Sequence, residues 1–200
     1  MEFNESQTKE NLMRAFAGES QARNRYTFAA EMAKKQGYAM IEKTFVFKAD
    51  QEKAHAEVFY NHLKELSGQT LFIDGGYPVD IYDDVIAALK SAAHNEYEEY
   101  EDVYQNFADI AKQEGFIKVE QDFRNIAEIE KMHGDRFSNL VQGLENNDLY
   151  QSLGTVRWMC LNCGFIYEGT HVPSQCPVCS YEQGYFIRLN NAPYKTEEKQ

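Results

Sequence analysis

Residues 125–133 read Asn-Ile-Ala-Glu-Ile-Glu-Lys-Met-His and lie in the middle of a long segment with helical periodicity. Steps of three and four residues along this segment meet only apolar side chains, except at Glu130 and His133. The stripe consists of Val119, Phe123, Ile126, Glu130, His133, Phe137, Leu140 and Leu144. An isolated charge is strongly unfavourable in an apolar core, so a carboxylate on this face needs a compensating partner. The stretch therefore predicts a helix with a functional group inside the core.

Three other segments carry acid near the middle of a largely apolar stripe. One contains Glu52-x-x-His55, the same motif as Glu130-x-x-His133. A second contains Glu96-x-x-Glu99, and its stripe is expected to continue through Val103, Phe107 and Ile110. The first segment of the chain contains Glu19. One such Glu-His pair is usually a solvated surface pair, but two copies on apolar stripes favour a buried metal site.

The periodicity predicts four long helices, over residues 7–35, 38–66, 80–113 and 116–145. Asp80 is the expected N-cap of the third helix. The connection over residues 67–80 spans at most about 48 Å when extended. The second helix is roughly 43 Å long, so this connection can return the chain to its far end. Helices two and three are then parallel, which predicts an all-α four-helix bundle of the ferritin-like type with one long crossover.

The two halves of the expected bundle repeat the same order of acidic residues. Glu19 precedes Glu52 by 33 residues, and Glu96 precedes Glu130 by 34. This repeat predicts a pseudo-twofold bundle with its ligands at mid-length. Two Glu-x-x-His pairs and single carboxylates from the other helices can enclose two cations. The candidate ligands are Glu19, Glu52, His55, Glu96, Glu99, Glu130 and His133.

The five candidate glutamates carry a charge of −5, which two ferrous ions (+4) or two ferric ions (+6) nearly cancel. Without such ions their burial costs several kcal/mol per group. Glu96-x-x-Glu99 supplies one acid more than a minimal site needs. A surplus ligand that exchanges with another as the metal charge changes is typical of a redox site rather than a structural one.

All four cysteines lie in two Cys-x-x-Cys pairs, Cys160/Cys163 and Cys176/Cys179. Disulfides are rare in the cytosol, so metal ligation is the preferred interpretation. Four thiolates form a tetrahedral site for zinc or a single iron, and the spacing alone leaves both open. The surrounding aromatic residues and the redox-capable bundle favour iron, because iron transfers electrons and zinc does not.

The chain has 200 residues and a net charge of −12 without a basic cluster, which argues against nucleic acid as a partner. No apolar run is long enough for a membrane span. The N-terminus lacks the features of a secretion signal, so a cytoplasmic location is expected. We expect a bundle over residues 1–147, a small irregular or β metal domain over 153–192 and a mobile tail over 193–200.

These motifs together resemble the rubrerythrin family over nearly the whole chain. The shared motifs are Gly18-Glu19-Ser20-Gln21-Ala22, Glu52-Lys53-Ala54-His55, Glu96-x-x-Glu99, Glu130-Lys131-Met132-His133, Cys160-x-x-Cys163-Gly164 and Cys176-Pro177-x-Cys179. The resemblance implies a non-haem di-iron peroxidase with a C-terminal rubredoxin-like domain that admits electrons to the bundle. It implies two iron ions in the bundle and one in the cysteine site. It further implies that iron moves between His55 and Glu99, and that Tyr26 and Tyr104 lie near the site.

The resulting functional prediction is reduction of hydrogen peroxide to water in oxidative-stress defence, with Glu99, His55, Tyr26 and Tyr104 as the catalytic residues. The expected electron donor is an external rubredoxin or an NAD(P)H-dependent reductase. The cysteine domain follows a helix end about 18 Å or more from mid-length, which favours a homodimer or higher homo-oligomer. The alternatives are a ferritin-like ferroxidase that stores iron and a zinc-ribbon interaction protein. Ser180 departs from free rubredoxins, which usually have Gly there.

Overall fold

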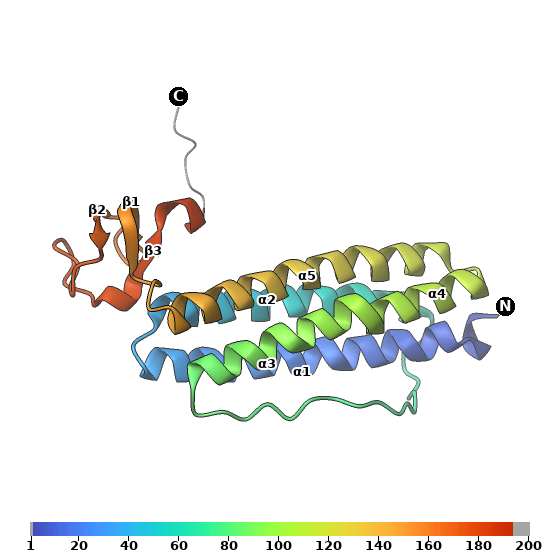
Figure 1. Ribbon diagram of the computed structural model, residues 1–200. Coiled ribbons are helices and arrows are strands. Elements are labelled where there is room, and N and C mark those ends of the chain that lie inside the picture. The colour runs from blue at the N-terminus through green and yellow to red at the C-terminus, as the bar shows by residue number, and fades with distance from the viewer. Residues whose placement is uncertain (1, 194–200) are drawn as a thin grey trace.

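The computed structural model describes residues 2–193, and it contains a helical bundle with a small sheet domain at one end (Figure 1). Apart from residue 193, the tail predicted over 193–200 lies outside the described residues. Among these residues, no helix has the length and apolar character that crossing a bilayer requires. The helices are α1 Gln7–Lys35, α2 Ala39–His62, α3 Val85–Glu98, α4 Tyr104–Glu114 and α5 Ile117–Glu145.

The chain direction confirms the ferritin-like bundle. α1 and α2 form one antiparallel pair, and α4 and α5 form another (Figure 1). The long connection runs back along the outside of the bundle, so that α2 and α3 point the same way. Gly37 and Gly115 follow α1 and α4 with φ of 82° and 89°, a conformation in which glycine has no steric penalty. Both helix ends lie where the sequence predicted them.

The ends of the crossover differ from the prediction. α2 stops at His62 and continues only as a 3-10 turn over Lys64–Leu66. The third helix starts at Val85, and its N-cap is Asp84, whose carboxylate accepts a hydrogen bond from the Ala87 amide at 2.8 Å. The prediction that Asp80 caps this helix is wrong. The Asp80 carboxylate instead binds side chains of α1 and α3, which lie far away in the sequence.

A π-helical turn over Glu99–Val103 divides the third rod into α3 and α4. The sequence predicted that Val103, Phe107 and Ile110 continue the buried stripe. The fully buried residues are instead the next ones along, Tyr104, Ala108 and Ala111. A π turn contains one residue more than an α turn, so every position after it is displaced by one on the helix face.

Two apolar clusters fill the bundle on either side of an acidic layer. One contains Tyr26, Phe45 and Phe137, whose rings contact one another at centroid distances of 5.2–5.8 Å. The other cluster lies in the opposite half of the bundle. It contains Phe59 and Phe123, whose rings stack at a centroid distance of 4.8 Å. The acidic layer is therefore sealed by close-packed side chains at both ends.

The C-terminal domain is a three-stranded antiparallel sheet in the order β2-β1-β3. Its strands are β1 Gln151–Cys160, β2 Ile166–His171 and β3 Phe186–Arg188. Trp158 of the central strand is fully buried, pairs with Tyr167 and Arg188, and donates its indole N–H to the Gly169 carbonyl at 3.0 Å. The core of this domain is small, and it includes Cys160 and Cys176.

Candidate metal centres

Six buried side chains from α1, α2, α3 and α5 meet in the acidic layer: Glu19, Glu52, His55, Glu96, Glu130 and His133. They form two groups of four, and within each group the ligand atoms lie within 4.8 Å of one another. Glu52 and Glu130 belong to both groups. Glu19 and His55 complete the first group, and Glu96 and His133 complete the second. Two shared carboxylates between two sets of terminal groups suit two adjacent cations.

The contacts inside these groups are not those of a hydrogen-bonded cluster. His55 Nδ1 lies 2.9 Å from Glu130 Oε1, and His133 Nδ1 lies 2.8 Å from Glu130 Oε2. These close approaches nevertheless lack hydrogen-bond geometry, and both carboxylate oxygens of Glu52 and Glu130 are buried without a partner. Buried polar atoms are nearly always satisfied, so this arrangement needs a ligand. The donor set of carboxylates and imidazoles fits two iron ions.

Two tyrosines each fix one oxygen of a glutamate that belongs to only one group, Glu96 or Glu19. The Tyr26 hydroxyl donates to Glu96 Oε1, and the Tyr104 hydroxyl donates to Glu19 Oε1. The second oxygen of each glutamate has no hydrogen-bond partner and faces a histidine, with Glu19 Oε2 3.6 Å from His55 Nδ1. Each tyrosine therefore orients a carboxylate toward the site without occupying its free oxygen.

Burial and mutual repulsion dominate the electrostatics of the acidic layer. Burial raises the pKa of Glu19 to about 8 and that of Glu130 well above its usual range. Burial also acts to raise the pKa of Glu52, but the adjacent His133 and His55 outweigh it and lower that pKa. Burial disfavours the imidazolium of His55, yet Glu19 and Glu52 raise its pKa to about 10. Without metal, bound protons partly neutralise the layer, and cations can replace them.

Glu99 lies beside this cluster but in neither group of four. It is the first residue of the π turn and is half-buried. Burial and the negative charges of Glu19 and Glu96 raise its pKa well above the usual range, which indicates proximity to the site. Its predicted role as a metal ligand stays a prediction.

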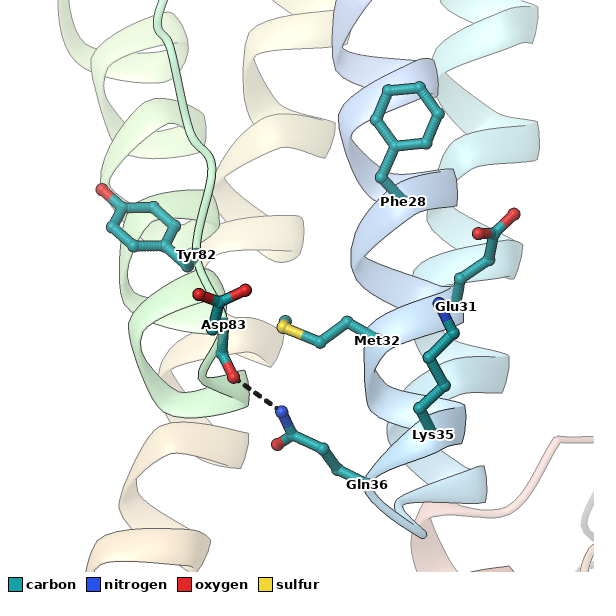
Figure 2. Close-up of a pocket in the computed structure, with 7 residues that line it drawn as sticks. All are labelled: Phe28, Glu31, Met32, Lys35, Gln36, Tyr82 and Asp83. Carbon is teal, nitrogen blue, oxygen red and sulfur yellow. Dashed lines mark hydrogen bonds between the residues drawn. The ribbon is translucent and has the colours of Figure 1, made fainter.

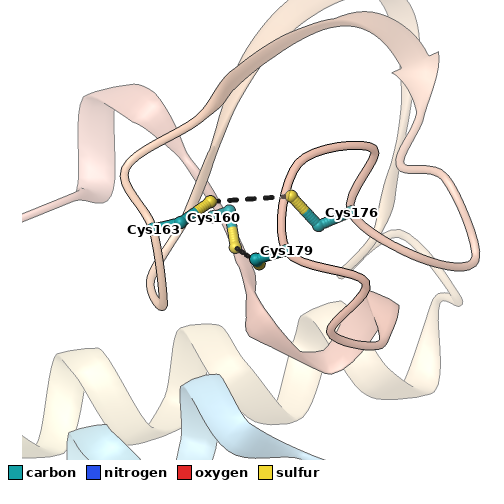
Figure 3. A group of neighbouring side chains, drawn as sticks. All are labelled: Cys160, Cys163, Cys176 and Cys179. Atoms are coloured by element: carbon teal, nitrogen blue, oxygen red, sulfur yellow. Dashed lines mark hydrogen bonds between the residues drawn. The ribbon is translucent and has the colours of Figure 1, made fainter.

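The four cysteines converge from the end of β1 and from the loops that hold Cys163, Cys176 and Cys179 (Figure 3). Two sulfur–sulfur distances, Cys160–Cys179 and Cys163–Cys176, are both 3.7 Å. A tetrahedral metal with bonds of about 2.3 Å to sulfur has edges of about 3.8 Å, so the thiols fit such an ion. The amide of Tyr181 donates to the Cys179 sulfur and lowers the pKa of that thiol to about 6.

Sequence patterns missed some residues around the bundle site. Lys48 is buried and its ammonium donates to Gln51 Oε1 at 2.9 Å, although its position on the α2 stripe could have indicated this. Asp80 was assigned the wrong role. A surface hollow of about 290 Å³ lies between α1 and the end of the crossover (Figure 2), where the Gln36 side-chain amide donates to the Asp83 carbonyl. None of the candidate metal ligands lines this hollow.

A ferritin-like bundle with these carboxylates and histidines, joined to a four-cysteine domain, defines a di-iron carboxylate protein with a rubredoxin-like iron site. The pattern of the rubrerythrin family matches residues 10–141, and that of the rubrerythrin, rubredoxin-like domain matches residues 158–187. The chain belongs to the rubrerythrin family. Its cofactors are two iron ions in the bundle and one iron in the cysteine site. Membership of this family, together with the two clusters of ligands, confirms the cofactors predicted from the sequence.

Individual relatives cover almost the whole chain. Rubrerythrin of Clostridium perfringens is 43% identical over 182 residues, which is 90% of this chain and 93% of the relative. Rubrerythrin of Nitratidesulfovibrio vulgaris is 38% identical, over 92% of this chain and 95% of the relative. Among solved structures, fully reduced, all-ferrous nigerythrin matches with a TM-score of 0.62 and 27% identity, over 92% of this chain and 90% of that one.

Proposed function

We propose that this protein reduces hydrogen peroxide to two waters at the bundle site, with electrons entering through the cysteine site. The observation that carries the proposal is the presence in one chain of a buried two-metal site and a partly exposed tetrathiolate site. An iron-storage protein does not need a second site through which electrons enter, so the cysteine site favours the peroxidase. Two ferrous ions, when bound, supply the two electrons that the reaction consumes along with two protons.

The chain's own residues orient the site and supply protons. Tyr26 and Tyr104 hold Glu96 and Glu19 in place by hydrogen bonds and leave the second oxygen of each glutamate free, so that it would be available to a bound iron. Glu99 is half-buried beside the cluster, and burial raises its pKa. It is therefore available both to hold a proton and to exchange with His55 as a ligand. These two roles assign Glu99 and His55 to the catalytic machinery.

The electrons come from an external donor, for which we propose a rubredoxin or an NAD(P)H-dependent reductase. Cys163 is exposed and gives such a donor access to the tetrathiolate iron. Within one chain the small domain lies at the end of the bundle and the acidic layer at mid-length (Figure 1). A head-to-tail homodimer can place the cysteine site of one chain closer to the bundle site of its partner.

The test is anaerobic addition of one equivalent of hydrogen peroxide to fully reduced protein, followed by stopped-flow absorption. Rapid oxidation of two ferrous ions per peroxide is expected. Glu99→Gln is expected to react at least about tenfold more slowly. Glu98→Gln, which changes an exposed neighbour, is the matched control and keeps the normal rate.

Slow or absent oxidation by peroxide contradicts the proposal. The storage alternative predicts that many irons per chain are taken up as mineral in the presence of oxygen. The zinc-ribbon alternative predicts a colourless cysteine site, whereas a ferric tetrathiolate is red. Metal analysis combined with a visible spectrum separates these three functions.

A further inference from the structure

Asp80 is the one residue near the end of the crossover that turns its side chain inward. It is half-buried, whereas residues 76–79 and 81–84 are all exposed. Its Oδ2 atom accepts a hydrogen bond from Arg25 Nη1 of α1 at 2.6 Å and another from Asn95 Nδ2 of α3 at 2.7 Å. The Arg25 and Asp80 side chains are only 12% and 15% exposed. A single carboxylate oxygen thus bridges two helices.

This bridge lies directly beside the metal site. Arg25 is followed by Tyr26, and Asn95 is followed by Glu96, the glutamate to which the Tyr26 hydroxyl donates. Neighbouring residues on a helix are only about 1.5 Å apart along its axis. The Asp80 bridge and the Tyr26–Glu96 hydrogen bond therefore join α1 and α3 at the same level.

Few other polar contacts hold these two helices in register. Over residues 2–193, the Tyr26–Glu96 bond is the only direct hydrogen bond between side chains of α1 and α3. The Arg25 guanidinium is itself fixed, because its Nε donates to Gln21 Oε1 at 2.8 Å. A movement of Asp80 would therefore displace Arg25 and Asn95, which are the chain neighbours of Tyr26 and Glu96.

We propose that Asp80 is a positioning residue for the di-iron site: by binding Arg25 and Asn95 together, it holds α1 and α3 at the separation that the Tyr26–Glu96 hydrogen bond requires. It touches no candidate metal ligand and acts only through these neighbours. The inference uses the metal site but does not depend on peroxide as the substrate, because affinity for the metal alone can test it.

The test is anaerobic titration of metal-free protein with ferrous ions. Loss of a residue that supports a metal ligand typically lowers affinity 10–100-fold, so Asp80→Ala is expected to bind at least tenfold more weakly in the bundle. Asp80→Asn keeps an oxygen that can accept both hydrogen bonds and loses only the charge. It is expected to stay within about threefold of the unchanged protein.

Asp74→Ala is the matched control, because Asp74 lies in the same crossover and also binds an arginine, Arg14, at 2.7 Å. Asp74 is 93% exposed, and Arg14 is adjacent in the chain neither to a candidate metal ligand nor to Tyr26. Its affinity for iron is expected to be unchanged. In a Tyr26→Phe background, Asp80→Ala is expected to cost clearly less than tenfold, because the bond it protects is already missing. Circular dichroism and the red cysteine site report folding independently of the bundle metals.

Normal affinity in Asp80→Ala overturns the inference. So does equal weakening in Asp80→Asn and Asp80→Ala, because the effect then comes from charge and not from position. If Asp80→Ala fails to fold, Asn95→Ala removes the α3 arm of the same bridge and is expected to show the same loss. Failure of the peroxide reaction with intact iron affinity in the unchanged protein rejects only the proposed function.

Discussion

Ser180 has a left-handed backbone conformation that a side chain normally disfavours. Its φ is 60°, and its amide donates to the Cys176 carbonyl at 2.9 Å. Gly164 occupies the corresponding position of the first cysteine pair, with φ of 77° and an amide bond to the Cys160 carbonyl at 2.8 Å. The two loops therefore have the same geometry, but only one has the residue that accepts it without strain.

Ser180→Gly is expected to stabilise the cysteine domain by about 0.5–1 kcal/mol. Relief of the left-handed conformation contributes about 1–2 kcal/mol, and the greater freedom of glycine in the unfolded chain offsets part of it. The measurement is loss of the visible absorption of the ferric tetrathiolate with increasing guanidinium, whose midpoint should rise. Gly164→Ser is the reciprocal variant and should lower the midpoint. A lower midpoint for Ser180→Gly would mean that the serine side chain is itself stabilising.

For single residues, the sequence indicates a site where a charged side chain occupies a position that the helical pattern predicts to be buried. Glu130 and His133 were found because charge on an apolar stripe is visible in one helix alone. Asp80 could not be understood in the same way, because its partners Arg25 and Asn95 lie 55 and 15 residues away. The local sequence around Asp80 predicted a helix N-cap, but in the fold Asp80 forms an ion pair with Arg25 instead.

Among the elements, the helices α1, α2 and α5 follow their predicted stripes, but the third rod does not. Its prediction fails after Glu99, where the π turn adds a residue. No composition or spacing signals this insertion. Its consequence is large, because it turns Tyr104 inward, where the tyrosine hydroxyl reaches Glu19 and the ring packs on Phe59 and Phe123. The turn therefore serves the site as well as the core.

Insertion of one alanine after Asp102, an exposed residue of the π turn, is expected to displace every following residue by one position and to rotate α4 by about 100° relative to α3. Tyr104 then loses both its aromatic packing and its bond to Glu19. Loss of a buried aromatic contact costs about 3–5 kcal/mol, and ferrous binding in the bundle should weaken at the same time. Urea unfolding and anaerobic iron titration measure the two effects.

The control for this insertion is one alanine inserted after Gly76 in the crossover, where a Cβ added to the glycine would meet no atom within 4 Å. Helicity measured by circular dichroism should be nearly unchanged in both variants. Normal iron affinity after the insertion at Asp102 would show that the helix register set by the π turn does not orient Glu19 through Tyr104.

For the whole molecule, the placement of the cysteine domain depends on a contact between two backbones. The domain lies at the α1–α2 turn end of the bundle (Figure 1). Leu161, from the first cysteine loop, and Ile187 pack against the bundle core. A Cβ atom added to Gly184 would lie 1.9 Å from the Gly37 carbonyl oxygen. Gly37 is equally constrained, since its φ is 82°. Two glycines far apart in the sequence therefore permit the domains to meet.

Gly184→Ala is expected to displace the cysteine domain from the bundle, because the rigid backbone of the turn cannot yield as a flexible side chain would. Overpacking of this kind costs about 1–3 kcal/mol, which the interface between domains must absorb. Amide hydrogen exchange should become faster in the α1–α2 turn and around Leu161, while both iron sites stay loaded. Gly154→Ala is the matched control, because a Cβ added there would meet no atom within 4 Å. If amide exchange in the turn of Gly184→Ala stays as slow as in the control, this contact does not hold the domain. A second outcome concerns electron transfer. If exchange becomes faster and the bundle irons are reduced more slowly, while peroxide oxidises the reduced protein at its normal rate, the docked position of the domain serves electron delivery.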